Sequence, residues 1–232
     1  ARGATLRIHE FDAAELEQNR VLPVATGGPT TRRLVSCGVA VAGADVRVVA
    51  PDTLDEVGAD RVGEILVAGG SVGQGYFGNA DASGAAFVAA PAFGARPYLR
   101  TGDLGFFHDG ELYICGRLKD LILIRGANHH APDIEATVEA SHPAIRPASG
   151  AAFPVDIDEQ EKLVVVYELD RGAAALDADH LAAVASAVRQ RVAEAHRIAV
   201  HAVLLVQRGV PKTSSGKVQR LACRAKYLAG GF

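Results

Sequence analysis

The stretch Leu99–Arg125, LRTGDLGFFHDGELYICGRLKDLILIR, is the part of the sequence that decides the fold. Apolar segments flank the dipeptide Asp109-Gly110 on both sides. Asp and Gly readily adopt the positive φ values of a two-residue turn, so the pattern predicts a β-hairpin. Asp103 precedes the first predicted strand and Arg117 follows the second. Closing the hairpin therefore brings these two side chains to the same end.

Asp103 and Arg117 have the chemistry of a site for a ribose phosphate. A carboxylate accepts hydrogen bonds from vicinal hydroxyl groups, and a guanidinium group donates to hydroxyl or phosphate oxygens. The same pair also fits a surface salt bridge that closes the base of a hairpin. Spacing alone does not separate these two interpretations.

The composition is that of an ordinary globular protein, with 49% hydrophobic and 22% charged residues among 232. This length fits one large domain or two small ones. The formal net charge of -3 gives no long-range attraction to nucleic acid or to an anionic membrane. No apolar run is long enough to span a bilayer, and no signal peptide is visible. The three widely spaced cysteines disfavour a disulfide framework, so we expect a cytoplasmic protein.

Residues 32–116 consist mostly of short apolar segments separated by polar turns, which predicts a small sheet or distorted barrel. The glycine-rich segment Gly69–Gly78 lacks the Gly-Lys-Ser/Thr ending of a nucleotide-binding loop. We interpret it as a flexible crossing segment. Strands are predicted at Arg33–Cys37, Val46–Ala50 and Val62–Ala68, and a short helix at Ala13–Gln18.

After Arg117 the pattern changes to interleaved strands and helices. Pro132 suits the first turn of a helix, which we expect to end near Ser141. Apolar side chains at helical spacing predict a long amphipathic helix over Asp179–His196. Strands are predicted at Leu121–Ile124, Ala148–Val155, Leu163–Leu169 and His201–Val206, and a basic helix at Val218–Leu228 follows the polar loop 211–217.

The predicted fold class is therefore α+β, in two parts. Residues 1–117 form a β-rich subdomain, and residues 118–232 form a small α+β domain. The boundary is placed at Leu118-Lys119.

Four ordered motifs cover nearly the whole chain and resemble the signatures of the adenylate-forming enzymes. This superfamily comprises the acyl-CoA synthetases, the adenylation domains of peptide synthetases and the luciferases. The resemblance implies that residues 1–117 are the last subdomain of a large N-terminal adenylation domain, and that residues 118–232 are a mobile C-terminal domain. The motifs are Gly63–Tyr76, Tyr98–Leu104, Gly116–Glu135 and Pro211–Lys217.

Within the superfamily, the segments Leu34–Gly38 and Asn128–Glu135 are most similar to the fatty acyl-AMP ligases. The resemblance implies activation of a fatty acid with ATP and Mg²⁺ as an acyl-adenylate. The acyl group then passes to the phosphopantetheine thiol of an acyl carrier protein. His130 and Ala131 depart from the Tyr and Gln that these ligases usually carry there. The alternatives are an acyl-CoA synthetase, an amino-acid adenylation domain, or a non-catalytic module that docks to a carrier protein.

The resemblance assigns roles to four residues of the predicted nucleotide site. Lys217 is the catalytic lysine, whose positive charge offsets the repulsion between two anions at the α-phosphate. Without the surrounding motif, Lys217 would be a solvated loop lysine. Asp103 and Arg117 hold the ribose and phosphate of ATP and of acyl-AMP. Ile114 lies against the nucleoside, or is a core residue of the hairpin.

Lys119 matches the hinge position about which the family rotates its small domain, and a hinge needs few residues that change φ and ψ. Arg125, Gly126 and Asn128 match a loop that faces the active site in the transfer state. The adjacent histidines after Asn128 have no cysteine or carboxylate at ligand spacing, so no metal site is expected in this chain.

The sequence holds no methionine, even at position 1, and the resemblance begins well inside the family pattern. We therefore expect an upstream portion of the same enzyme with the phosphate loop, the acyl pocket and the Mg²⁺ ligand. Residues 1–232 alone are expected to be inactive. The cationic residues of the last helix, Arg220, Arg224 and Lys226, fit either a solvated face or a contact with an acidic carrier protein.

Overall fold

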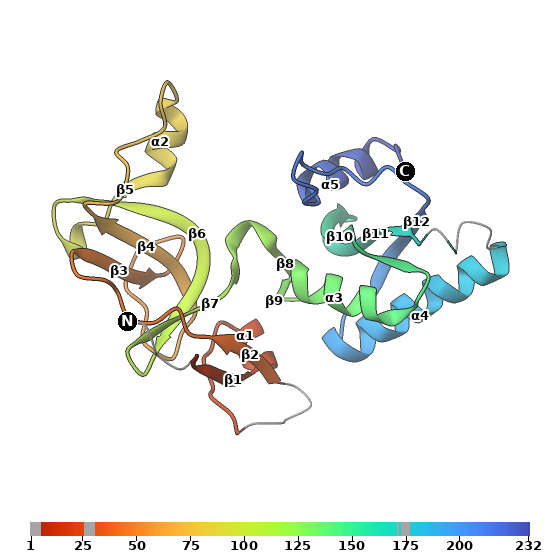
Figure 1. Cartoon of the computed structure of the whole chain (residues 1–232), viewed down its shortest axis with the longest axis horizontal. Helices are drawn as coiled ribbons and strands as arrows, with labels where there is room; N and C mark the ends of the chain where they lie inside the picture. Colours follow the sequence, from red (N-terminus) through yellow and green to blue (C-terminus); the bar gives the residue numbers. More distant parts are fainter. Residues whose placement is uncertain (1–5, 26–30, 171, 173–176) are drawn as a thin grey trace. The chain divides into compact units, whose positions relative to one another are not determined.

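The computed structural model of the protein describes residues 6–25, 31–170, 172 and 177–232. The chain divides into two compact units, Ala1–Lys119 and Asp120–Phe232 (Figure 1). The division lies two residues after the limit predicted at Arg117, within the 3₁₀ turn η2 (Leu118–Asp120). Both units contain helices and strands, which confirms the predicted α+β class.

A five-stranded antiparallel sheet forms the centre of the first unit. Its strand order is β3-β4-β6-β5, and β7 pairs with β6 outside this path. The three strands predicted ahead of the hairpin are present with shifted ends, as β2 (Thr31–Val35), β3 and β4, and β2 lies in a separate sheet. The strands are β3 (Ala44–Val49), β4 (Gly63–Gly69), β5 (Phe87–Ala89), β6 (Pro97–His108) and β7 (Glu111–Arg117).

The long hairpin of β6 and β7 confirms the two-residue turn predicted at Asp109-Gly110. Both turn residues have positive φ, 51° for Asp109 and 76° for Gly110. Phe106 and Tyr113 face each other across the hairpin in a stacked arrangement, with ring centroids 5.7 Å apart. Both rings are fully buried. The turn and this apolar pair together fix the register of the hairpin next to the turn. Between Leu104 and Gly105 a β-bulge shifts the register by one residue.

A two-stranded antiparallel sheet pairs β1 (Ile8–Asp12) with β2 (Thr31–Val35). Helix α1 (Ala13–Glu17) follows β1 directly, and the Asp12 carboxylate accepts the Glu15 N–H at its start. This helix agrees with the one predicted at Ala13–Gln18. Strand β1 was not predicted, because its five residues, IHEFD, lack a continuous apolar pattern.

Helix α2 (Ala80–Ala86) was not predicted, and it lies in a region expected to hold mostly strands and turns. None of its residues is buried, so the sequence carries no apolar helical periodicity there. The Asn79 side chain accepts the Ala82 N–H and caps the helix. A short 3₁₀ turn, η1 (Pro91–Phe93), follows β5.

The second unit is built on the three-stranded sheet β10-β11-β12, in which β10 and β11 are antiparallel and β11 and β12 are parallel. Figure 1 shows α3 and α4 on one side of this sheet and α5 on the other. A short hairpin of β8 and β9 precedes α3. The elements are β8 (Leu121–Ile124), β9 (Ala127–His130), α3 (Ala131–Ser141), β10 (Ile145–Ile157), β11 (Gln160–Leu169), α4 (Ala178–His196), β12 (Val200–Val206) and α5 (Arg220–Leu228).

Both faces of this sheet carry a hydrophobic core, because β11 alternates between them. Leu163, Val165 and Tyr167 pack with α3 and α4. Val164 and Val166 face the opposite core, which includes Cys223 of α5. A strand covered on both faces reads as a nearly continuous apolar run, and the sequence LVVVYEL has this character. Within the part of the chain that the structure describes, no helix has the length and apolar character needed to cross a membrane.

Gly150 in β10 lies directly against the neighbouring strand. A Cβ atom added to Gly150 would lie 2.3 Å from the Tyr167 ring and 2.4 Å from the Val166 carbonyl oxygen. Tyr167 is almost fully buried and donates a hydrogen bond to the Glu135 carbonyl oxygen, so its ring has little freedom to move.

Gly150→Ala is therefore expected to destabilise the second unit by about 3 kcal/mol through overpacking. Chemical denaturation measures this change. Gly172→Ala is the control, because its nearest neighbour would be 3.7 Å away, an ordinary contact. Equal unfolding midpoints for the two variants would contradict the close packing of Gly150 against Tyr167.

Candidate functional site

Asp103 and Arg117 lie opposite each other where β6 and β7 pair. They are partners in the strand register, and the Arg117 Nε donates to Asp103 Oδ1 at 2.5 Å. Half of the Arg117 side chain and a quarter of the Asp103 side chain remain exposed. The predicted juxtaposition is thus present, although Asp103 lies within β6 and Arg117 is the last residue of β7, rather than outside the two strands. Both groups keep surface that a ligand can contact.

The backbone that carries Asp103 is held by β4. The Thr101 hydroxyl accepts the Asp103 N–H at 3.0 Å and donates to the Ile65 carbonyl at 2.7 Å. Gly102 has a φ of 69°, which favours glycine, and its N–H donates to Glu64 Oε1. Glu64 is 1% exposed. These contacts fix the turn immediately before Asp103.

Arg100 neutralises the buried Glu64 carboxylate with two hydrogen bonds from its guanidinium group. These hydrogen bonds, which Arg100 donates to Glu64, raise the pKa of Arg100 above its ordinary value. Sequence reasoning missed Glu64 as a support of the candidate site. The available signal was a single carboxylate inside the apolar strand GEILVA, where a buried charge requires a partner.

Ile114 and Lys119 complete the predicted positions of the first unit. Ile114 on β7 is 42% exposed, which excludes the alternative that it is a buried core residue of the hairpin. Lys119 is exposed in η2 and is the last residue of the first unit. Ile114 is therefore accessible to a ligand, and Lys119 lies where the chain divides; the roles of both residues stay predictions.

Arg125 and Gly126 form the two-residue turn between β8 and β9. Both have positive φ, 53° and 78°, and both are exposed. Such a conformation is uncommon for arginine. Asn128 lies on β9 opposite Leu123. The two residues at the tip and Asn128 are thus carried by one small hairpin of the second unit.

A pocket of about 410 Å³ lies beside this turn. Glu161 is part of its wall, and the Glu161 Oε2 atom is buried without a hydrogen-bond partner among the described residues. Burial, and then the nearby charge of Asp156, raise the pKa of Glu161, while the Leu123 N–H and Arg224 oppose this shift. The lining residues are Leu123, Ile124, Arg125, Gly126, Gln160, Glu161, Lys162, Leu163 and Ala199.

Lys217 lies at the end of a closed turn formed by residues 213–217. The Thr213 N–H donates to the Lys217 carbonyl at 2.8 Å, and the Thr213 hydroxyl accepts the Lys217 N–H at 3.0 Å. Gly216 takes a φ of 83° within the turn. The Lys217 side chain is exposed, and its ammonium group has no ion-pair partner among the residues that the structure describes.

The cationic residues of α5 make contacts within the second unit, which corrects the expectation of a merely solvated face, while a contact with a carrier protein stays a prediction. Arg220 makes two hydrogen bonds of 2.7 Å to Glu135, and these raise the pKa of Arg220 further. Arg224 donates to the Pro154 carbonyl, and the Lys226 ammonium group donates to the Gly209 carbonyl. The helix begins at Arg220 rather than at Val218, because Val218 pairs with Lys212 in an isolated β-bridge.

The predicted site residues fall into two groups, one in each unit. Asp103, Ile114 and Arg117 share the β6–β7 hairpin of the first unit. Lys217 and the β8–β9 turn belong to the second.

Comparison with known proteins gives relatives over nearly the whole chain. The chain is 44% identical to the medium-chain-fatty-acid–acyl-carrier-protein ligase JamA of Moorena producens, over 98% of this chain and 39% of that protein. It is 37% identical to the long-chain-fatty-acid–AMP ligase FadD26 of Mycobacterium tuberculosis, over 99% of this chain and 40% of that protein. A sequence model of the disco-interacting protein 2-like AMP domain matches residues 119–232.

A solved structure from studies of fatty acyl-adenylate ligases from E. coli and L. pneumophila matches with a TM-score of 0.76 and 28% identity. The match covers 97% of this chain and 38% of that one. The chain belongs to the superfamily of adenylate-forming enzymes. It spans about two fifths of the length of its curated relatives, which are 39% and 40% covered.

The substitution Glu161→Gln is expected to stabilise the second unit at neutral pH, by less than about 1 kcal/mol because the group is partly exposed. A pKa raised in the folded state means that the free energy of unfolding falls as pH rises above the ordinary value of 4.5. The introduced amide carries no charge, so it removes the free-energy cost of burying the ionised carboxylate. Thermal unfolding at several pH values measures the difference, which should shrink below the ordinary value.

The control is Glu159→Gln, which makes the same charge change at an exposed position two residues away. A lower unfolding temperature for Glu161→Gln at pH 7 than for the control would show that the Glu161 charge is not penalised.

Proposed function

We propose that this chain acts as the C-terminal part of a fatty acyl-AMP ligase. The enzyme activates a fatty acid with ATP as an acyl-adenylate and passes the acyl group to the phosphopantetheine thiol of an acyl carrier protein. The observation that carries the proposal is the Asp103–Arg117 pair, partly exposed at the point where β6 and β7 meet. The similarity to JamA and FadD26, whose names state fatty acid ligation, supports the choice of substrate.

The Asp103 carboxylate has the acceptor oxygens needed for two ribose hydroxyl groups. Arg117 can donate to a ribose or phosphate oxygen with the N–H groups that do not bind Asp103. The Ile114 side chain provides exposed apolar surface on the same strand for the nucleoside. Together the three residues bind and orient the nucleotide.

Lys217 acts in the adenylation step. A fatty acid carboxylate oxygen attacks the α-phosphorus of ATP, a new O–P bond forms, and pyrophosphate leaves. Negative charge gathers at the α-phosphate as the two anions meet, and an ammonium group placed there lowers the barrier. Mg²⁺ is proposed as the counter-ion of the ATP phosphates, and no residue of this chain is assigned to it.

The transfer step is assigned to residues around the junction of the units. Lys119 is proposed as the hinge, and the division of the chain directly after it supports this role. Arg125, Gly126 and Asn128 are proposed to act when the acyl group is transferred. The positive φ of Arg125 supports a functional reason for keeping arginine at a turn position that disfavours it. The reaction is proposed to take place in the cytoplasm.

The product of the reaction tests this proposal. The protein that contains residues 1–232 is incubated with labelled fatty acid, ATP, Mg²⁺ and either CoA or a phosphopantetheinylated acyl carrier protein. We expect acyl-AMP to accumulate with CoA and acyl-carrier protein to form with the carrier. Efficient formation of acyl-CoA would show an acyl-CoA synthetase, and activation of an amino acid instead would show an amino-acid adenylation domain. A protein that forms no adenylate but binds the carrier would be a docking module.

Lys217→Ala is expected to reduce the rate of acyl-AMP formation by roughly 10²–10³-fold, the effect of removing one group that stabilises transition-state charge. Pyrophosphate exchange into ATP measures this step. Arg191→Ala is a control, because Arg191 pairs with Glu194 on the exposed surface of α4. Exchange by Lys217→Ala at the control rate would remove Lys217 from the mechanism.

A further inference from the structure

Glu168 is a buried carboxylate inside the apolar strand β11. It is 5% exposed, and it follows Val164 and Val166 at alternate positions on the face that packs toward α5. The segment that leads from β12 to the lysine loop passes over this face. Glu168 therefore lies under the start of the loop that carries Lys217.

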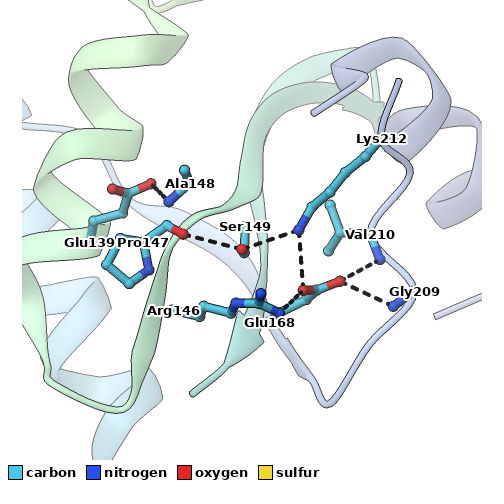
Figure 2. Close-up of polar contacts among 9 residues, drawn as sticks. All are labelled: Glu139, Arg146, Pro147, Ala148, Ser149, Glu168, Gly209, Val210 and Lys212. Atoms are coloured by element: carbon cyan, nitrogen blue, oxygen red, sulfur yellow. Dashed lines mark hydrogen bonds and ion pairs between the residues drawn. The ribbon is translucent and has the colours of Figure 1, made fainter. Parts of the chain in front are cut away.

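The Glu168 carboxylate binds this segment at three points (Figure 2). Its Oε1 atom accepts the N–H groups of Gly209 and Val210, each at 3.3 Å. Its Oε2 atom accepts the Lys212 ammonium group at 3.3 Å. Arg146 of β10 donates to the same Oε2 atom at 3.1 Å. One carboxylate thus joins β10 and β11 to the residues that begin the loop.

An irregularity in β10 brings two more polar groups to Lys212. The β10–β11 register breaks between Ile145 and Gly150, where Ala148 has a φ of 51°. The Glu139 carboxylate accepts the Ala148 N–H at 2.9 Å and holds this bulge in place. Ser149 then accepts the Lys212 ammonium group at 3.1 Å, as Figure 2 shows.

The hydrogen bonds and charges around Glu168 favour its ionised form. Burial alone would raise the pKa of Glu168. The hydrogen bond and charge of Lys212, with the N–H groups of Val210 and Gly209, outweigh burial and hold the pKa below its ordinary value. The carboxylate is therefore charged at neutral pH and keeps its ion pair with Lys212.

The turn that carries Lys217 is tied at both ends. At its start, Lys212 is bound by Glu168 and pairs with Val218 across the turn. At its end, α5 is bound through Arg220 to Glu135. Lys217 lies between these two ion pairs, and its own side chain is exposed.

We propose that Glu168 is a positioning residue for adenylation, which holds Lys212 and the backbone of Gly209 and Val210 so that Lys217 reaches the α-phosphate. This proposal rests on the proposed function. Glu168 itself touches neither substrate nor nucleotide. Its effect passes through the backbone of the loop, and misplacing a catalytic group by about 1 Å can reduce a rate by roughly 10²-fold.

Glu168→Gln in the protein that contains residues 1–232 tests the proposal. The amide keeps the shape of the side chain but removes the charge that binds Lys212. We expect pyrophosphate exchange into ATP to slow by about 10- to 100-fold in kcat, with KM for ATP nearly unchanged. Transfer from supplied acyl-AMP to the carrier thiol should stay within about twofold, because Lys217 is assigned to adenylation alone.

Glu139→Gln is the matched control. Glu139 belongs to the same network, but among the described residues its carboxylate bonds only the Ala148 N–H, and an amide oxygen can accept that bond equally. Both half-reactions of this variant should match those of the unsubstituted protein. If Glu168→Gln acted through a general loss of packing, it would slow adenylation and transfer together.

A second variant covers the case in which Glu168→Gln does not fold. The double substitution Glu168→Gln with Lys212→Met removes both charges of the ion pair, so no unpaired ammonium group is left half-buried. The Arg146 side chain, which also pairs with Glu168, is 43% exposed, so water can solvate its guanidinium group when that partner is lost. We expect this variant to fold and to show the same selective loss of adenylation.

The outcomes separate this proposal from the proposed function. Adenylation within about twofold of the unsubstituted protein, or an equal loss of both half-reactions, would overturn the positioning role alone. If the unsubstituted protein forms no acyl-adenylate, the proposed function fails, and the role of Glu168 falls with it.

Discussion

The register of the β6–β7 hairpin is the constraint on which the candidate nucleotide site depends. The positive φ values of Asp109 and Gly110 close the hairpin, and the buried Phe106–Tyr113 pair fixes which residues lie opposite each other. A shift of one residue would move every side chain to the other face of the sheet. A β-bulge then shifts the register by one residue between Leu104 and Gly105, and this shift places Asp103 opposite Arg117. The meeting of a carboxylate and a guanidinium group at the far end thus depends on the turn, the apolar pair and the bulge together.

Buried and half-buried carboxylates have a common role in both units. Glu64 lies under the backbone that precedes Asp103, Glu168 under the start of the lysine loop, and Glu135 beside its end. Each has cationic partners and backbone N–H groups, so none is an unpaired buried charge. Exposed polar groups that act on a ligand need such rigid support, because their own surroundings are mostly water. We infer that these carboxylates anchor the segments that carry Asp103 and Lys217 to the core of each unit.

Sequence patterns predicted the elements whose apolar periodicity is strong. The hairpin, the strands β8 and β12, and the helices α3 and α4 fall close to their predicted bounds, because burial on one face leaves a clear pattern. Helix α2 buries none of its residues and left no pattern. The meeting of Asp103 and Arg117 followed from local spacing. The contacts of Glu168 join residues up to 44 positions apart, and only the folded sheet brings them together.

The most direct test of this account is a crystal structure of the protein that contains residues 1–232, bound to a non-hydrolysable analogue of acyl-AMP. The measured quantity is the distance from the Asp103 carboxylate oxygens to the ribose hydroxyl groups. The account predicts hydrogen bonds at about 2.5–3.0 Å to these hydroxyls, with Arg117 donating to the ribose or phosphate. A nucleotide bound away from Asp103 and Arg117, with their ion pair intact and unliganded, would contradict it.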